Sequence, residues 1–203
     1  MNIAVIGTGN IGSTLASKWV EKGHRIFLGV RDTNNFKGQA LVQNDLISAH
    51  PIAEAVAHSD VILIATPPEI APNLAKQMGN THGKVIIDAT NSVRTKPAPY
   101  ETAYHALAEL TEADVVKCFN TTGFENMANP NYDGHAIDLF MAGDSDRAKA
   151  VAHALAMDVG FDNCYDFGQG AQVVLLEQLA ISWINLAIFQ QMGRNIGFKL
   201  LHR

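Results

Sequence analysis

Three glycines near the N-terminus have the spacing Gly-x-Gly-x-x-Gly. They are Gly7, Gly9 and Gly12, and they directly follow the apolar run 2–6. In this spacing the first glycine permits a tight turn, the second lets the backbone approach a pyrophosphate, and the third lets the following helix pack closely on the strand. That helix would face the phosphates with unpaired N–H groups. A purely structural glycine turn can have the same spacing. Here, however, the motif lies between an expected strand and an expected helix, which favours a dinucleotide site.

The end of the second expected strand bears on the choice between NAD and NADP. An NAD site places an acidic residue there for the ribose 2′-hydroxyl, whereas an NADP site offers cations to the 2′-phosphate. Here the strand 25–30 is followed by Arg31, with Lys37 close behind. This favours NADP(H). Two alternatives stay open, because Asp32 could serve NAD and Arg31 could be a solvated loop residue.

Polar residues follow three later expected strands, in the segments 66–68, 88–91 and 120–122. The carboxyl ends of parallel strands meet at one edge of a sheet, where the nicotinamide would lie. Proline pairs also end strands for structural reasons, and Asp88 could cap a turn. The candidate cofactor-binding residues are Gly7, Thr8, Gly9, Asn10, Ile11, Gly12, Arg31, Lys37, Thr66 and Pro67. The candidate substrate-binding residues are Asn120, Thr121 and Thr122.

No residue stands out as a proton donor or metal ligand, so the catalytic residues stay unknown. The eight His residues show no His-x-x-x-His spacing, and we predict no metal. Cys118 and Cys164 fall in two expected strands, which is typical of reduced, buried thiols rather than a redox pair. Hydride transfer between two bound cofactors needs no acid, whereas a carbonyl or imine substrate would need one.

The elements that must position these residues alternate between strand and helix. Strands are expected at 2–6, 25–30, 46–50, 61–65, 85–88, 115–119, 136–142 and near Cys164, and helices at 10–22, 52–58, 69–78, 100–110 and 145–157. This alternation predicts an α/β fold, a Rossmann-type doubly wound parallel sheet with right-handed crossovers.

A long apolar segment, 171–191, follows the alternating part of the chain. Polar residues such as Gln172, Glu177 and Asn185 interrupt it every few positions, which argues against a membrane span. A helix so apolar must be buried, partly against a second subunit. We therefore predict a dinucleotide-binding domain over 1–165, a C-terminal helical dimerisation segment over 166–203, and a homodimer.

Composition favours a soluble protein that acts on small molecules. The net charge is −5, with 47% hydrophobic and 17% charged residues, and no run of Lys or Arg suggests a nucleic-acid or membrane surface. Met1 is followed so closely by the first strand that a signal peptide has no room. We expect a cytoplasmic protein with no nucleic-acid or membrane partner.

Several segments together resemble the NADPH-dependent deazaflavin (coenzyme F420) reductase family. They are the glycine turn, the strand end with Arg31, Val116 to Thr121, Ala142 to Asp144, and Met192 to Lys199. The glycine turn and the Phe-Asn-Thr stretch also resemble the cytoplasmic reductase domain of the STEAP ferric reductases. The resemblance implies hydride transfer between NADPH and a deazaflavin stacked on the nicotinamide, in a dimer closed by C-terminal helices.

The resemblance also implies roles for individual residues. Thr8, Asn10 and Ile11 would contact the NADP phosphates and ribose, Arg31 the 2′-phosphate, and residues 120–122 would border the second ring. Archaeal members carry a Ser-Arg-Arg type cluster after the second strand, where this chain has Val30-Arg31-Asp32. The loss of one hydroxyl and one cation implies weaker NADP affinity.

Three functions remain in competition. The first is an NADPH-dependent oxidoreductase that passes hydride to a deazaflavin or a flavin-like acceptor. The second is an imine or keto-acid reductase, which is disfavoured because such enzymes carry a longer helical C-terminal domain and fewer than 50 residues follow Met157 here. The third is a non-enzymatic NADP(H) sensor that signals through its dimer.

Overall fold

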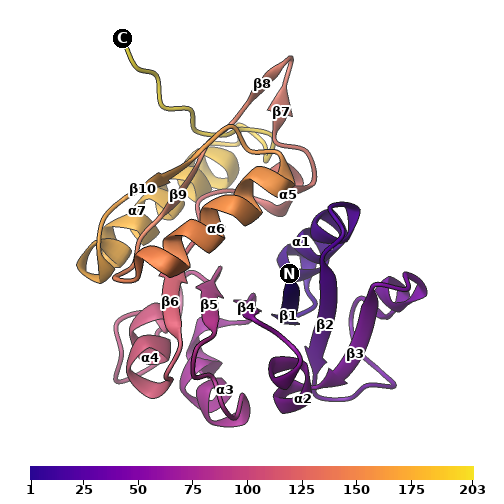
Figure 1. Ribbon diagram of the computed structural model, residues 1–203. Helices are drawn as coiled ribbons and strands as arrows, with labels where there is room; N and C mark the ends of the chain where they lie inside the picture. Colours follow the sequence, from indigo (N-terminus) through magenta and orange to yellow (C-terminus); the bar gives the residue numbers. More distant parts are fainter.

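The computed structural model describes all residues, 1–203, and is built on a six-stranded parallel sheet in the order β3-β2-β1-β4-β5-β6 (Figure 1). Its strands are β1 (Asn2–Ile6), β2 (Arg25–Val30), β3 (Ile47–Pro51), β4 (Val61–Ile64), β5 (Val85–Asp88) and β6 (Asp114–Lys117). The order reverses between β1 and β4, which is the switch point of a doubly wound sheet. The expected Rossmann-type fold is confirmed.

Helices cover both faces of the sheet. Alternate strand residues such as Ile3 and Val5 pack with α1 (Asn10–Glu21) and α6 (Asp146–Val159). Their neighbours, such as Ala4 and Ile6, pack on the opposite face with three short helices and a C-terminal one. These are α2 (Ile52–Ala57), α3 (Ala71–Gln77), α4 (Ala103–Leu110) and α7 (Val173–Ile184). Because both faces are covered, the central strands are apolar throughout rather than alternating.

The chain beyond β6 departs from the expected pattern. A short helix α5 (Phe124–Ala128) leads to the hairpin β7 (Asn131–Tyr132) and β8 (His135–Ala136), and β9 (Leu139–Met141) then pairs in parallel with β10 (Cys164–Asp166). The single strand expected over 136–142 is therefore wrong. It is broken at Asp138, whose backbone N–H donates to Phe198 O and whose carboxylate accepts from the backbone N–H of Leu200.

Two further boundaries differ from the expectation. Strand β6 ends at Lys117 rather than 119 because Phe119 has a φ of +60°, which a strand cannot contain. Cys118 thus lies just beyond the strand. Helix α4 begins at Ala103 rather than 100 because the Thr102 side chain caps it by accepting from the His105 N–H.

The apolar segment expected as one helix consists of three parts. A 3₁₀ turn over Gly170–Gln172 leads into α7, which ends in a π-helical turn over Asn185–Phe189. By length and composition Gly170–Phe189 could cross a membrane, with 20 residues and a mean hydropathy of 1.5. One side of α7, including Leu176, Ala180 and Trp183, is instead buried inside the molecule. The last residues then turn back over α5 and leave the body at the C-terminus (Figure 1).

Candidate active site

The glycine turn connects β1 to α1 and is built so that only glycine fits at two of its three positions. Gly7 has a φ of +101°, and a Cβ there would lie 2.3 Å from Ala65 O. A Cβ on Gly12 would lie 2.0 Å from Gly7 O. A Cβ on Gly9, by contrast, would meet nothing within 4 Å. The backbone at Gly9 therefore faces open space in which a ligand can approach it.

Helix α1 begins without any protein group that neutralises its N-terminus. No side chain caps it at Gly9, and its first turn contains no acidic residue. Ser13 makes the first backbone bond, donating to Gly9 O at 2.9 Å. The N–H groups of the first turn are consequently available to an anion such as a pyrophosphate.

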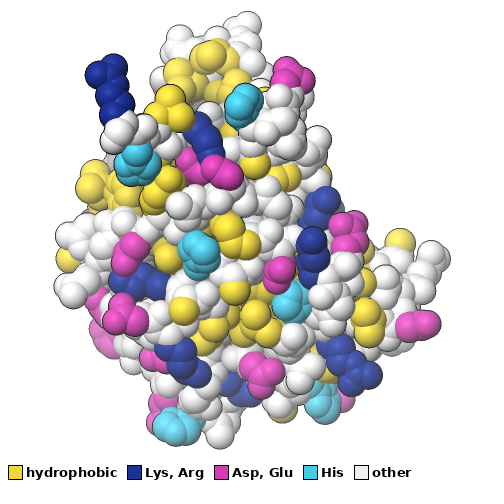
Figure 2. Space-filling model, turned by 45° about the horizontal axis from the view of Figure 1, so that its top comes forward, with side chains coloured by type: hydrophobic (Ala, Val, Ile, Leu, Met, Phe, Trp, Pro, Cys, Tyr) yellow, Lys and Arg dark blue, Asp and Glu magenta, His cyan; other side chains and the backbone are white.

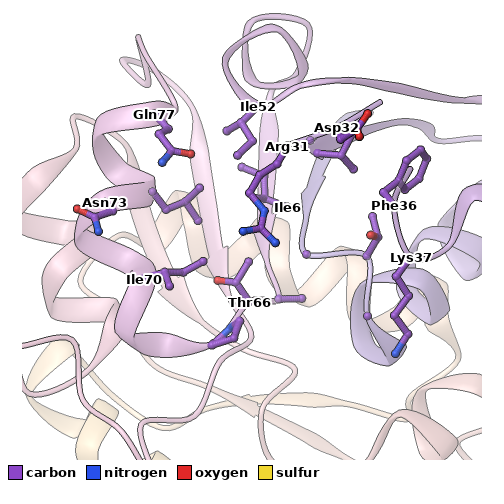
Figure 3. Close-up of a pocket in the computed structure, with 18 of the residues that line it drawn as sticks. Ile6, Arg31, Asp32, Phe36, Lys37, Ile52, Thr66, Ile70, Asn73 and Gln77 are labelled. Carbon is purple, nitrogen blue, oxygen red and sulfur yellow. The ribbon is translucent and has the colours of Figure 1, made fainter. Parts of the chain in front are cut away.

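A pocket of about 950 Å³ opens beside this turn, between the loops that follow β1, β2 and β4. Figure 3 shows α3, with Ile70 directly before it, forming one wall of the pocket, and the Ile70 and Gln77 side chains point towards the side on which Arg31 lies. Of the expected cofactor-binding residues, the ones that line it are Gly7, Thr8, Gly9, Arg31, Lys37, Thr66 and Pro67. Asn10, Ile11 and Gly12 lie in the first turn of α1 and do not line the pocket.

Two cations lie on this pocket. Arg31 follows β2 and points into the cavity, while the carboxylate of Asp32 points away from it (Figure 3). Lys37 reaches back to the start of α1, where its Nζ donates to Asn10 Oδ1 at 3.3 Å. The two side chains place positive charge at the end of β2 and at the helix N-terminus, which suits a ligand with more than one phosphate.

The loops after β5 and β6 meet, as their place at one sheet edge predicts. Asn91 Nδ2 donates to Asn120 O at 2.9 Å, and Asn120 Nδ2 donates to Asn91 Oδ1 at 3.0 Å. The strained backbone of Phe119 lies directly before this contact and is held by Trp19, whose ring centroid is 5.7 Å away. Asn120, Thr121 and Thr122 are thereby placed at the carboxyl edge, outside the pocket described above.

Four buried polar atoms at this edge have no hydrogen-bond partner within the protein. They are Thr66 Oγ1, Thr90 Oγ1, Ser92 Oγ and Asn120 Oδ1, which follow β4, β5 and β6. Buried polar atoms are nearly always hydrogen-bonded in native proteins, so such a group calls for an additional partner. A ligand with amide and hydroxyl groups would supply these bonds. The open backbone at Gly9, the cations and these atoms together fit a nicotinamide dinucleotide.

A buried charged cluster behind this edge was missed by sequence reasoning. Lys117 Nζ, at the end of β6, donates to Asp88 Oδ2 at 2.9 Å and to Glu177 Oε1 at 2.5 Å. The other Glu177 oxygen accepts from the Ser92 N–H at 2.9 Å. The cluster thus joins β5, β6 and α7 and contacts the loop after β5. Two features of the sequence could have revealed the cluster: a lysine that ends an apolar strand and a glutamate inside an apolar helix.

The C-terminal segment that carried part of the family resemblance packs beside the expected substrate loop. Asn126 Nδ2 donates to Thr122 Oγ1 and to Ile196 O, both at 2.7 Å, and Trp183 Nε1 also donates to Ile196 O at 2.7 Å. A largely apolar hollow of about 370 Å³ lies here, between the end of α7 and the segment 195–198. The substrate loop and the C-terminus therefore form one unit.

Few groups near the site can exchange protons. The charged residues lining the large pocket are Arg31, Asp32 and Lys37, with no His, Cys, Tyr or Glu among its lining residues. The two cysteines are buried and form no disulfide, and their thiols lie within hydrogen-bond distance, with the sulfur atoms 3.6 Å apart. The Cys118 thiol and burial raise the pKa of Cys164 well above its usual range. Neither thiol is open to a substrate.

The fold and this pocket define a dinucleotide-binding Rossmann protein. Residues 2–92 match the model of the family described as NADP oxidoreductase, coenzyme F420-dependent, which confirms the resemblance seen in the sequence. A proposed F420-dependent NADP reductase of Arthrobacter sp. FB24 is similar over the full length of both chains, with 26% identity and a TM-score of 0.86. Both matches are to NADP-dependent oxidoreductases, and they support this class of enzyme for the protein.

More distant structures share the fold. An imine reductase of Streptomyces aurantiacus has 18% identity and a TM-score of 0.70, with 94% of this chain matched to 64% of that one. A reductive aminase of Aspergillus terreus in complex with NADPH4 has 21% identity and a TM-score of 0.68, matching 94% of this chain and 62% of that one. The imine-reducing proteins are thus longer than this chain.

Proposed function

We propose that this protein transfers hydride between NADP(H) and a deazaflavin or flavin-like acceptor. The observation that carries the proposal is the pocket lined by Arg31, the glycine turn and Thr66, together with the unpartnered polar atoms after β4, β5 and β6. In this arrangement Arg31 binds the 2′-phosphate, and the N-terminus of α1 binds the pyrophosphate. Thr66 and Pro67 border the nicotinamide, while Asn120, Thr121 and Thr122 border the acceptor ring.

A separate group of pocket residues would bind the adenine ring of the cofactor. Ile52 and Ile70 supply apolar surface on opposite sides of the pocket, and Asn73 and Gln77 supply amide groups on the α3 wall (Figure 3). An adenine ring needs flat apolar contacts and a few amide partners, which these side chains provide. No part of this wall was expected from the sequence.

The residues expected to border the acceptor, Asn120, Thr121 and Thr122, include no acid or base, which favours a ring acceptor over a carbonyl or imine. When bound, NADPH would supply the hydride, and reduction of a deazaflavin or flavin ring would also require one proton, which water can provide. Thr, Ser and Asn side chains can orient two stacked rings but do not exchange protons near neutral pH. An imine or keto acid would require an acid in contact with the substrate.

The test is the oxidation of NADPH with purified protein and four kinds of acceptor: deazaflavin, free flavin, a ferric chelate and a cyclic imine. We expect turnover with the deazaflavin or flavin, at a rate that exceeds the imine rate. Turnover of the imine alone would overturn the proposed acceptor. NADPH binding without turnover of any acceptor would instead favour an NADP(H) sensor.

We also propose that the protein is a cytoplasmic homodimer. The face in Figure 2 shows Lys, Arg, Asp and Glu side chains interspersed, without a broad basic patch, which suits a cytoplasmic enzyme acting on small molecules. Exposed apolar side chains near the C-terminus, Leu175, Ile188, Phe189 and Met192, suit a homodimer. In that dimer the segment 166–203 packs on its counterpart.

A further inference from the structure

We propose that His50, Glu54 and His58 form a surface binding site for a divalent transition-metal ion, with Zn²⁺ as the representative ligand. His50 lies in the edge strand β3, Glu54 lies in α2 and His58 directly follows α2, and none of the three lines the cofactor pocket. Their ligand atoms all lie within 4.8 Å of one another. The sequence spacing predicted no metal because it showed no His-x-x-x-His pair, whereas here a carboxylate lies between two histidines spaced by eight residues.

The distances between the side chains suit a shared ion. His50 Nδ1 lies 3.0 Å from Glu54 Oε1, and His58 Nε2 lies 3.8 Å from the same oxygen. Zn²⁺ binds imidazole nitrogen and carboxylate oxygen at about 2.0–2.2 Å, so tetrahedral ligands are separated by roughly 3.3–3.6 Å. Two imidazoles and one carboxylate are a ligand set that Zn²⁺, Ni²⁺ and Cu²⁺ accept.

A second interaction fixes the His50 ring in the orientation that binding requires. Its Nε2 lies 2.8 Å from Ser48 Oγ, so that nitrogen is engaged on the far side of the ring from Glu54. A hydrogen bond from the nitrogen that does not bind the metal is the usual way in which a metal-binding histidine is oriented. The other ring nitrogen of His50, Nδ1, can then bind the same ion as Glu54 and His58.

Aromatic packing holds the second ring. Phe27 of β2 stacks on His58 with the ring centroids 5.4 Å apart and contacts His50 at 5.8 Å. Side-chain exposure rises from 21% for His50 to about half for Glu54 and His58. Water can therefore reach the ion and complete its coordination, while Phe27 and Ser48 keep the imidazoles in place. Metal binding here would join the edge strand to α2.

The site is tested with tag-free protein and Zn²⁺ alone, by isothermal titration calorimetry and thermal unfolding. We expect one equivalent to bind and the melting temperature to rise with Zn²⁺, because an ion that binds the folded state stabilises it. His58→Gln and Glu54→Gln should each weaken binding at least about tenfold, and Ser48→Ala by a smaller factor. His135→Gln, at an exposed histidine on the β7–β8 hairpin, is the matched control and should bind as wild type.

Cobalt distinguishes this site from the buried thiols. Bound Co²⁺ should show the visible bands of nitrogen and oxygen ligation without a sulfur charge-transfer band. Absence of a one-equivalent binding event, unchanged affinity in both His58→Gln and Glu54→Gln, or a sulfur band would each overturn the proposal. Circular dichroism of the variants without metal checks that they fold.

Discussion

At the scale of single residues, Gly9 and Gly12 form a matched pair of substitutions. Gly9→Ala adds a methyl group into open space, so the stability should change by no more than about 1 kcal/mol. The same methyl group should obstruct the pyrophosphate and raise the dissociation constant for NADPH. Gly12→Ala places a methyl group against the backbone of Gly7 and should cost about 1–3 kcal/mol or more.

Urea unfolding and NADPH fluorescence titration measure these two effects separately. Equal NADPH affinity in Gly9→Ala and wild type would refute binding of the pyrophosphate at this backbone. A fully stable Gly12→Ala would refute the close packing of α1 on the turn.

Arg31 tests the preference for NADP over NAD. A charge-assisted hydrogen bond contributes about 1.5–3 kcal/mol, so Arg31→Ala should raise KM for NADPH by about tenfold to a hundredfold and leave KM for NADH nearly unchanged. Steady-state kinetics with both cofactors provide the measurement. Arg25→Ala, at the opposite end of β2, serves as the control because Arg25 does not line the pocket. A similar rise in KM for both cofactors would show that Arg31 does not bind the 2′-phosphate.

At the scale of elements, the buried cluster of Asp88, Lys117 and Glu177 joins α7 to the sheet. Lys117→Met leaves two buried carboxylates without their cation, which should lower the free energy of unfolding by about 3–5 kcal/mol. Chemical denaturation measures this loss. Lys18→Ala, which removes a partly exposed ion pair with Glu21, should cost no more than about 1 kcal/mol.

Replacing all three charges at once separates charge burial from packing. The variant Lys117→Met, Asp88→Asn, Glu177→Gln should recover part of the stability lost in Lys117→Met, because no uncompensated charge remains buried. If the triple variant is less stable than Lys117→Met, the ion pairs are not the main contribution of these residues.

Tyr104 of α4 gives a prediction for alkaline pH. Burial, with the nearby Asp144 carboxylate, raises the pKa of Tyr104 from 10.0 to about 12. The folded state therefore holds this proton more tightly than the unfolded state. Its contribution to stability is complete below pH 10 and is lost as the pH rises through about 12. Tyr104→Phe should show a flatter fall in stability over this interval, measured by urea unfolding, and an unchanged slope would contradict the assignment.

At the scale of the whole molecule, the exposed apolar residues of the C-terminal segment predict self-association. Phe189 is 69% exposed and Met192 60% exposed, next to the end of α7. Burying such a patch in a second copy would remove it from water. Light scattering at micromolar concentration should give the mass of a dimer, and Phe189→Asp should shift it towards the monomer. Leu110→Asp, an exposed leucine on α4, should not, and a monomeric wild type would refute the dimer.

Much of the fold could be predicted because its signals are local. The bounds of β1, β2 and β5 agree with the expected 2–6, 25–30 and 85–88. Short apolar runs bounded by glycine or polar residues specify strands that are buried on both faces. Errors fell where tertiary contacts override the local pattern, as at Asp138, which is bonded to the C-terminal segment, and at Phe119, whose backbone is strained against Trp19.

The sequence by itself determined the Rossmann architecture, the glycine turn, and the place of Arg31 at the end of β2, because apolar periodicity and glycine spacing act over a few residues. Only the tertiary structure decided what faces these groups. The α3 wall of the pocket and the pairing of Lys117 with Glu177 each join segments that local patterns do not relate. Their contacts depend on how helices pack on the sheet, since packing alone brings distant side chains within bonding distance.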